Sequence, residues 1–166
     1  MTDFEALLKA LVGARVEFIV VGGLAGRIHG AARLTEDIDV VYKKSRGNVE
    51  KLVEALKPFT PYLRGAPPGL PFKWDAPTVW AGLNFTLDTS AGDIDLLGEI
   101  TGGGRYEDIE TDCVNATMFG VAFKCLDLDK LIEVKRAAGR VKDFDALGEL
   151  QRIQKERFDS PSDPAP

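Results

Sequence analysis

Residues 18–42 read FIVVGGLAGRIHGAARLTEDIDVVY, and this stretch decides which kind of fold the chain adopts. An apolar run at 18–21 leads into two glycines, a segment of helix length and a second apolar run at 37–42. A short run of this kind is typical of a strand that is covered on both faces. The order strand, helix, strand favours a sheet that is flanked by helices.

Two carboxylates interrupt the second apolar run. Side chains alternate faces along a strand, so Asp37 and Asp39 point to one face, with α-carbons roughly 7 Å apart, while Ile38 and Val40 point to the other. Burying a carboxylate without a partner costs several kcal/mol. This pair therefore requires a cation.

The same pattern returns at GDIDLL, residues 92–97, where Asp93 and Asp95 share one face of a second strand. If the two strands converge, their carboxylates form one acidic surface. Hard oxygen ligands suit Mg²⁺ (or Mn²⁺), which keeps several waters and completes its coordination with substrate phosphates. The alternative is that the acids merely line a solvated strand face. Two pairs on otherwise apolar runs favour the metal site.

Gly22 and Gly23 stand where the first strand becomes a helix. Without side chains the backbone can approach an anion closely, and unpaired N–H groups at a helix start can bind phosphate. A Gly-Gly turn is weak support by itself, since turns need glycine in any case. Beside a carboxylate pair, it favours one site in which glycines hold phosphates and acids hold the metal.

Length and charge limit the class of protein. The chain has 166 residues, 45% of them apolar, which supports one core rather than two. Its formal charge of −5 gives no general attraction for nucleic-acid phosphates or anionic lipid. We find neither a signal peptide nor an apolar run of membrane-spanning length. We expect a soluble, cytoplasmic protein with no membrane partner, one domain over residues 1–158 and a disordered tail over 159–166.

The two cysteines, Cys113 and Cys125, lie in strand-like apolar contexts. Buried thiols in a reducing compartment are the favoured interpretation, and a disulfide stays open. With only one histidine in the chain, a structural zinc site is disfavoured.

Patterns along the chain predict the remaining elements. Helical spacing predicts helices over residues 2–13, 24–32, 47–59, 126–139 and 142–158. Further strands are expected in a hairpin over 79–100, with its turn at 90–92, and at 113–120 and 121–126. Residues 60–78 are rich in proline and predict an irregular loop, and residues 101–110 predict a glycine loop. The predicted fold class is α/β (α+β), with a mixed sheet flanked by helices and two helices at the C-terminal end.

Residues 22–40, GGLAGRIHGAARLTEDIDV, resemble the signature of the DNA polymerase β-like nucleotidyltransferases, and most of all the small bacterial branch of the AbiEii-type toxins. In that branch a Gly-Gly helix, His-Gly, Arg-x-Thr and Asp-x-Asp recur in this order. DIDLL at 93–97 takes the place of the third catalytic carboxylate, and residues 128–147 resemble a late Lys…Arg-x-Lys-Asp motif. The match spans most of residues 18–147 apart from the proline-rich loop. The combination is specific, whereas no single piece is.

The resemblance implies that Asp37, Asp39 and Asp95 are the metal-binding and catalytic carboxylates. Asp37 and Asp39 would bind the metals, and Asp95 would help to activate the acceptor hydroxyl. We choose Asp95 over Asp93 because it lies deeper in its strand.

The resemblance also implies a set of substrate-binding residues. Gly22 and Gly23 would flank the nucleotide phosphates, although many relatives have Gly-Ser here, so a hydroxyl contact is missing. Arg33 and Lys135 would face phosphates, and Thr35 would orient the loop. The alternatives are a surface ion pair for Arg33 and a solvated helix face for Lys135.

Four further residues have open roles. A lone histidine at a helix end is more often a packed, hydrogen-bonded residue than a base, so we favour a structural role for His29. Arg140 and Lys142 form a basic cluster with Lys135, and Asp143 would pair with Arg140 or cap the last helix.

The sequence thus predicts a metal-dependent nucleotidyltransferase that transfers an NMP from an NTP to an acceptor hydroxyl. The acceptor is open among a tRNA end, a protein and a small molecule, and a toxin with an antitoxin partner is one form of this hypothesis. The lack of a broad basic surface weighs against a large RNA. A metal-dependent phosphohydrolase and a non-catalytic nucleotide-binding module on the same fold are the alternatives.

Overall fold

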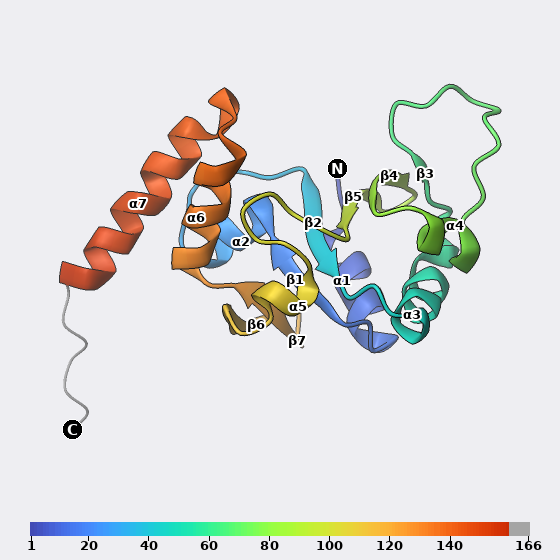
Figure 1. The fold of residues 1–166 in the computed structure, drawn as a ribbon, viewed down its shortest axis with the longest axis horizontal. Helices are drawn as coiled ribbons and strands as arrows, with labels where there is room; N and C mark the ends of the chain where they lie inside the picture. The colour runs from blue at the N-terminus through green and yellow to red at the C-terminus, as the bar shows by residue number, and fades with distance from the viewer. Residues whose placement is uncertain (160–166) are drawn as a thin grey trace.

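The computed structural model describes residues 1–159, which form a seven-stranded mixed sheet flanked by helices (Figure 1). The strand order is β3-β4-β5-β2-β1-β7-β6. This architecture, with two helices at the C-terminal end, confirms the predicted fold class. The predicted tail lies outside the described residues, apart from Asp159 at the end of the last helix.

The sheet is built from strands of two to six residues, and most of the helices are short. The strands are β1 (Phe18–Val21), β2 (Asp37–Tyr42), β3 (Tyr62–Leu63), β4 (Asn84–Thr89), β5 (Gly92–Leu97), β6 (Cys113–Met118) and β7 (Val121–Leu126). The helices are α1 (Phe4–Gly13), α2 (Gly22–Ile28), α3 (Arg46–Leu56), α4 (Ala76–Ala81), α5 (Tyr106–Ile109), α6 (Leu128–Ala138) and α7 (Phe144–Asp159), with 3₁₀ turns at Lys57–Phe59 and Val141–Asp143.

The centre of the sheet is β1, which is buried along its whole length, as its apolar sequence predicts. It pairs with β2 in antiparallel and with β7 in parallel orientation. On its other side β2 pairs in parallel with β5, and β5 continues into the predicted hairpin with β4. The two Asp-Ile-Asp strands are therefore direct neighbours.

The apolar residues between the acids hold β2 and β5 in place. Ile38, Val40, Ile94 and Leu96 have no exposed surface. They belong to the same hydrophobic core as the buried leucines of α1 and α3, two helices that pack against each other. Burial of one such side chain stabilises the fold by about 1.5–3 kcal/mol. The acids consequently face away from this core.

Helix ends follow the predicted signals. Asp3 caps α1, because its side chain accepts a hydrogen bond from the backbone N–H of Ala6 at 2.9 Å. α6 ends at Gly139, which adopts a left-handed conformation with φ of 61°. The predicted break between the two C-terminal helices is thus confirmed, and α7 packs beside α6 (Figure 1).

Two segments contain more structure than the sequence predicts. Within 60–78, β3 pairs with β4 at the edge of the sheet, and α4 starts at the cap residue Asp75 with Pro77 in its first turn. Proline is compatible with a first helical turn, since the N–H that it lacks has no partner there. Within 101–110, residues 106–109 form α5. Proline and glycine content alone was therefore a poor guide to these segments.

Cys113 and Cys125 are free thiols; Cys125 is buried as predicted, whereas Cys113 is only half-buried. Burial raises the pKa of Cys113 to about 11 and that of Cys125 to about 12. Within the described part of the chain, each helix is either too short or too polar to cross a lipid bilayer.

The Asn48 side chain bridges the two strands at the end of the β1–β2 pair where β1 begins and β2 ends. Its side chain is buried and accepts from the N–H of Glu17 at 2.7 Å, while its amide donates to the carbonyls of Glu17 at 3.0 Å and Lys43 at 2.7 Å. These contacts join the residue before β1 to the residue after β2.

We predict that Asn48→Ala lowers the free energy of unfolding by about 2 kcal/mol, because the Glu17 N–H and the Lys43 carbonyl lose their partly buried hydrogen bonds to this side chain. Urea denaturation followed by circular dichroism measures the change. Asn115→Ala is the matched control, because Asn115 is exposed on β6 and should change stability little. Equal stability of both variants would contradict the assigned role.

Candidate active site

The parallel pairing of β2 with β5 aligns the acids in two rows. Asp37 lies opposite Asp93, and Asp39 lies opposite Asp95. Carboxylate oxygens of Asp37, Asp39 and Asp95 all lie within 4.8 Å of one another. The structure thus brings the three predicted catalytic carboxylates together in one cluster, the acidic triad, which does not include Asp93.

The triad is electrostatically unfavourable without a cation. Burial, and then the charges of Asp37 and Asp95, raise the pKa of Asp39 to about 8, although Lys135 acts in the opposite direction. Asp95 Oδ1 is buried and, among residues 1–159, accepts no hydrogen bond. Carboxylate oxygens are hard donors, and a close cluster of them fits a divalent cation such as Mg²⁺ or Mn²⁺.

Gly22 and Gly23 make room for the triad and its support. Gly22 has φ of +66°, and a Cβ atom on it would collide with the carboxylate of Asp39. A Cβ on Gly23 would lie 2.7 Å from Thr35 Oγ1. The Thr35 hydroxyl in turn donates to the backbone carbonyl of Asp37 at 3.1 Å. The glycines therefore have a packing role in addition to any contact with a ligand.

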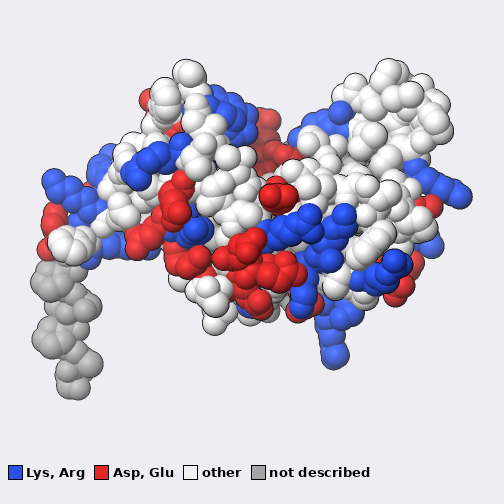
Figure 2. All heavy atoms as spheres, in the orientation of Figure 1, with Lys and Arg blue, Asp and Glu red and all other residues white. Residues whose placement is uncertain are grey.

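A cavity of about 260 Å³ opens beside the triad. Its acidic wall comes from β2 and β5, and its other walls come from α2, the 31–35 loop, α6 and the α6–α7 junction. Four basic side chains line it, from Arg33, Lys135, Arg140 and Lys142. Figure 2 shows acidic side chains in a hollow that has basic side chains on its rims. Every predicted substrate-binding residue therefore borders this cavity, and their roles stay predictions.

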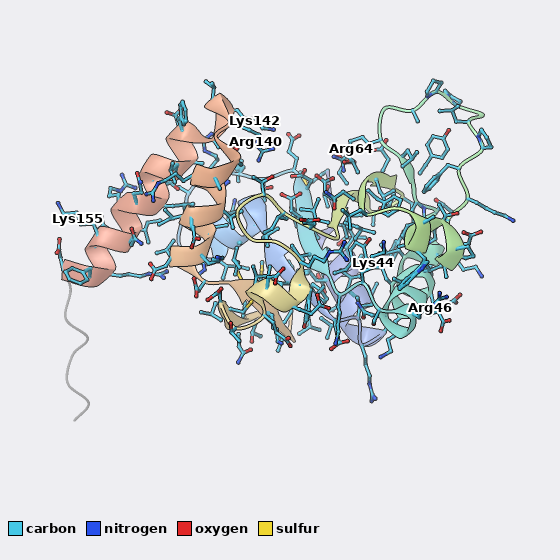
Figure 3. All side chains as sticks on the ribbon, in the orientation of Figure 1. Lys44, Arg46, Arg64, Arg140, Lys142 and Lys155 are labelled. Atoms are coloured by element: carbon cyan, nitrogen blue, oxygen red, sulfur yellow. The ribbon has the colours of Figure 1, made fainter. Side chains whose placement is uncertain are left out.

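The basic side of the cavity is held by Asp143. Arg140 Nε lies 2.6 Å from Asp143 Oδ2, and Lys135 Nζ lies 3.9 Å from Asp143 Oδ1. Asp143 also lines the cavity, and its side chain is only 13% exposed, so it holds both cations at this wall. Figure 3 shows Arg140 and Lys142 at the α6–α7 junction.

The cavity continues past the triad on the other side of Asp39. A second space of about 330 Å³ shares Gly22, Asp39 and Lys135 with the first. The apolar residues Leu131 and Val134 of α6 border it. Together the two spaces form a groove with the acids near its middle.

Arg64 is a functional candidate that the sequence analysis did not select. It follows β3 and lies across the hollow from Arg140 and Lys142 (Figure 3). Its guanidinium lies within 4.0 Å of a carboxylate oxygen on each of four aspartates: Asp37, Asp88, Asp93 and Asp95. Burial opposes its charge, but Asp95 and Asp93 raise the pKa of Arg64 on balance. The aligned acids indicated that a cation was needed, but no local pattern in the proline-rich segment selected Arg64, because its position depends on the pairing of β3 with β4.

His29 lies outside the groove. It is buried, with Nε2 2.8 Å from the carbonyl oxygen of Leu126 and Nδ1 3.3 Å from Arg157 Nη1. With these partners the ring donates through Nε2 and accepts through Nδ1. This environment agrees with a structural role.

Comparisons with known proteins connect this geometry to a fold. No protein-family model and no curated protein matches the chain. The solved structure of the lincosamide antibiotic adenylyltransferase LnuA, lincomycin-bound, has a TM-score of 0.59 at 13% identity and covers 92% of this chain and 98% of that one. A candidate nucleotidyltransferase from Thermotoga maritima has a TM-score of 0.55 at 15% identity, with 88% of each chain covered.

ANT(2'')-Ia in complex with adenylyl-2''-tobramycin has a TM-score of 0.50 at 16% identity and covers 93% of this chain and 92% of that one. At these identities the likeness is one of fold. The chain therefore has the nucleotidyltransferase fold, as the resemblance implied.

We predict that Gly22→Ala lowers the free energy of unfolding by about 2 kcal/mol, because alanine is strained at positive φ and its methyl group displaces Asp39. Urea denaturation measures the loss. Gly148→Ala in α7 is the control: nothing lies within 4 Å of its Cβ position, so it should gain about 1 kcal/mol. A Gly22→Ala protein as stable as the wild type would contradict the packing role.

We also predict that the metal-free protein loses stability as pH rises from about 4 to about 8. Over this range folded Asp39 keeps a proton, because its pKa is raised from 3.8 to about 8, whereas the unfolded chain has lost that proton. This contribution is complete below about pH 4 and lost above about pH 8. Urea denaturation in EDTA at several pH values measures it. Asp39→Asn should lack this part of the slope, and parallel curves for both proteins would contradict the prediction.

Proposed function

We propose that the protein is a metal-dependent nucleotidyltransferase that moves an NMP from an NTP to an acceptor hydroxyl. The supporting observation is the groove itself. Three clustered carboxylates form one wall, and basic side chains from α6 and the α6–α7 junction form the opposite wall. A nucleoside triphosphate needs both, since its phosphates require cations and its metal ion requires carboxylates.

Asp37, Asp39 and Asp95 are the residues that would hold Mg²⁺ or Mn²⁺. A bound cation would coordinate the Asp95 oxygen that accepts no hydrogen bond, and it would lower the raised pKa of Asp39. When bound, such an ion neutralises charge on the reacting phosphates and on the attacking oxygen.

The phosphates would lie near the backbone of Gly22 and Gly23, which border the cavity together with the Asp39 and Thr35 side chains packed against them. Lys135 and Arg33 border the same space and would neutralise the phosphate oxygens. Thr35 Oγ1 lies 2.7 Å from the position that a Cβ atom on residue 23 would occupy. We propose that this hydroxyl takes the place of the serine found in many relatives.

In the reaction, the acceptor hydroxyl gives its proton to Asp95 and its oxygen attacks the α-phosphorus. A new P–O bond forms, the bond between the α-phosphorus and its bridging oxygen breaks, and pyrophosphate leaves with the electron pair. Lys135, which lines the same cavity, would neutralise the charge that builds up on the leaving group. Positioning and charge neutralisation account for most of the expected acceleration.

The neighbours suggest which substrates to test first. LnuA is an adenylyltransferase in a lincomycin-bound structure, and the ANT(2'')-Ia structure holds adenylyl-2''-tobramycin. We therefore propose ATP as donor and a small molecule with a free hydroxyl as acceptor. The net charge of −5 weighs against a large RNA acceptor. A labelled tRNA or protein would instead support the toxin form of the hypothesis, in which a small antitoxin binds this protein.

We predict that the wild-type protein, given α-³²P-ATP and Mg²⁺ or Mn²⁺, transfers label to an acceptor from cell extract. Asp39→Asn should lose this transfer by at least about 10³-fold, because the ion loses a ligand while the side-chain shape is kept. Chromatography of the labelled products measures it. Asp129→Asn makes the same chemical change on exposed α6 surface, where Asp129 contacts Gln154, and should retain transfer.

The same assay separates the alternatives. Label released as free nucleotide would support a metal-dependent phosphohydrolase. Nucleotide binding without turnover by any acceptor pool would support a non-catalytic module. Full transfer by Asp39→Asn would contradict the mechanism.

A further inference from the structure

Arg64 contributes a cation to the acidic face from outside the predicted motifs. It directly follows β3, a two-residue strand at the edge of the sheet, and its backbone N–H donates to the carbonyl of Thr86 at 2.9 Å. Gly65 follows with φ of +77°, and the chain then runs without helix or strand until α4. Arg64 therefore stands where the ordered sheet edge meets the long loop (Figure 3).

Groups outside the triad anchor the guanidinium. Nη2 donates to the carbonyl of Leu87 at 2.8 Å, and Nε donates to Asp88 Oδ1 at 3.2 Å. Asp93 Oδ2 lies 3.5 Å from Nε. These contacts fix the plane of the guanidinium group along the β4–β5 hairpin.

The same guanidinium also reaches into the triad. Nη2 lies 2.9 Å from Asp95 Oδ1, and Nη1 lies 4.0 Å from Asp37 Oδ2. Nη2 carries two N–H groups, and its one well-aligned hydrogen bond goes to Leu87. Asp95 Oδ1 has the positive charge 2.9 Å away but no well-aligned donor. Arg64 thus neutralises Asp95 without satisfying its oxygen.

A divalent cation on Asp95 would conflict with this arrangement. A magnesium ion lies about 2.1 Å from its ligand oxygen, so an ion on Asp95 Oδ1 would be at most about 5 Å from Nη2. Repulsion between charges of +2 and +1 at about 5 Å lowers ion affinity roughly 10-fold even with water-like screening. Asp39 has no contact with Arg64 in the structure and is not subject to this competition at short range.

We propose that Arg64 is an internal cation that competes with a divalent ion for Asp95. A first ion binds through Asp39 and Asp37 with Arg64 in place. Binding of a second ion at Asp95 requires the guanidinium to leave that carboxylate, which couples occupancy of the site to the chain segment after β3. Arg64 is thus a positioning residue, and the inference rests on the proposed metal site.

Mn²⁺ titration without nucleotide tests the competition, with free Mn²⁺ followed by electron paramagnetic resonance. We expect wild-type protein to bind one ion and then a second roughly 10-fold or more weaker. Arg64→Gln removes the charge and should raise the affinity for the second ion about 10-fold. Arg46→Gln is the charge-matched control, because Arg46 stacks on Trp80 at 4.7 Å and contacts no acid of the site. It should bind both ions as the wild type does.

Three results would overturn the proposal. Unchanged binding in Arg64→Gln would exclude competition, and an equal rise in Arg46→Gln would show a long-range effect of net charge. Absence of Mn²⁺ binding in all three proteins would overturn the metal site itself and hence the proposed function. The first two results leave the proposed function intact, so the failures are distinguishable.

A second measurement does not depend on the folding of Arg64→Gln. The Nε–H resonance of Arg64 in wild-type protein, assigned by comparison with Arg64→Lys, is followed by NMR during Mg²⁺ titration. We expect its shift to follow the second binding step. A resonance that stays unchanged to saturation would overturn the proposal.

Discussion

The parallel pairing of β2 with β5 is the constraint on which the site depends. It places Asp39 directly beside Asp95, an arrangement that the carboxylates themselves oppose. The pairing persists because Ile38 and Ile94, also opposite each other, are fully buried on the reverse side of the sheet. The energy that holds like charges together thus comes from the hydrophobic core and the backbone ladder. A site assembled in this way is already arranged for an ion before any ion arrives.

Without an ion the acidic face is partly neutralised in two different ways. Asp39 takes up a proton, as its raised pKa indicates, because it is buried among the other acids. Asp95 instead lies beside the guanidinium of Arg64. An ion at Asp39 would displace a proton, whereas an ion at Asp95 would, on our proposal, displace an arginine that directly follows β3.

The acidic face was predictable from sequence because its information is local. Alternation within Asp-Ile-Asp fixes which side chains share a face, whatever the strand pairs with. The cation beside it was not predictable in the same way. Arg64 reaches the acids only because Leu63 pairs with Leu87 at the sheet edge, and no local pattern in the proline-rich segment encodes that pairing.

The two glycines show a different limit of sequence analysis. Their position at the start of a helix suggests a phosphate site, and the only other reason that the sequence offers is the turn between strand and helix. The structure adds that Gly22 leaves room for Asp39 and Gly23 leaves room for Thr35. Both partners lie more than ten residues further along the chain, so the packing reason appears only once the chain is folded. Packing alone thus accounts for glycine at both positions, and the phosphate role needs its own test.

The width of the groove depends on two ladders that meet at β1. The acidic wall is attached to β1 through its antiparallel pairing with β2. The basic wall belongs to α6, which starts directly after β7, and β7 is attached to the other side of β1 through the parallel pairs of Ile19 and Val20. Because β1 is buried along its length, neither wall can shift without disturbing the core. The distance between carboxylates and lysine is therefore set by the buried centre of the sheet, whereas Arg64 directly follows the edge strand β3.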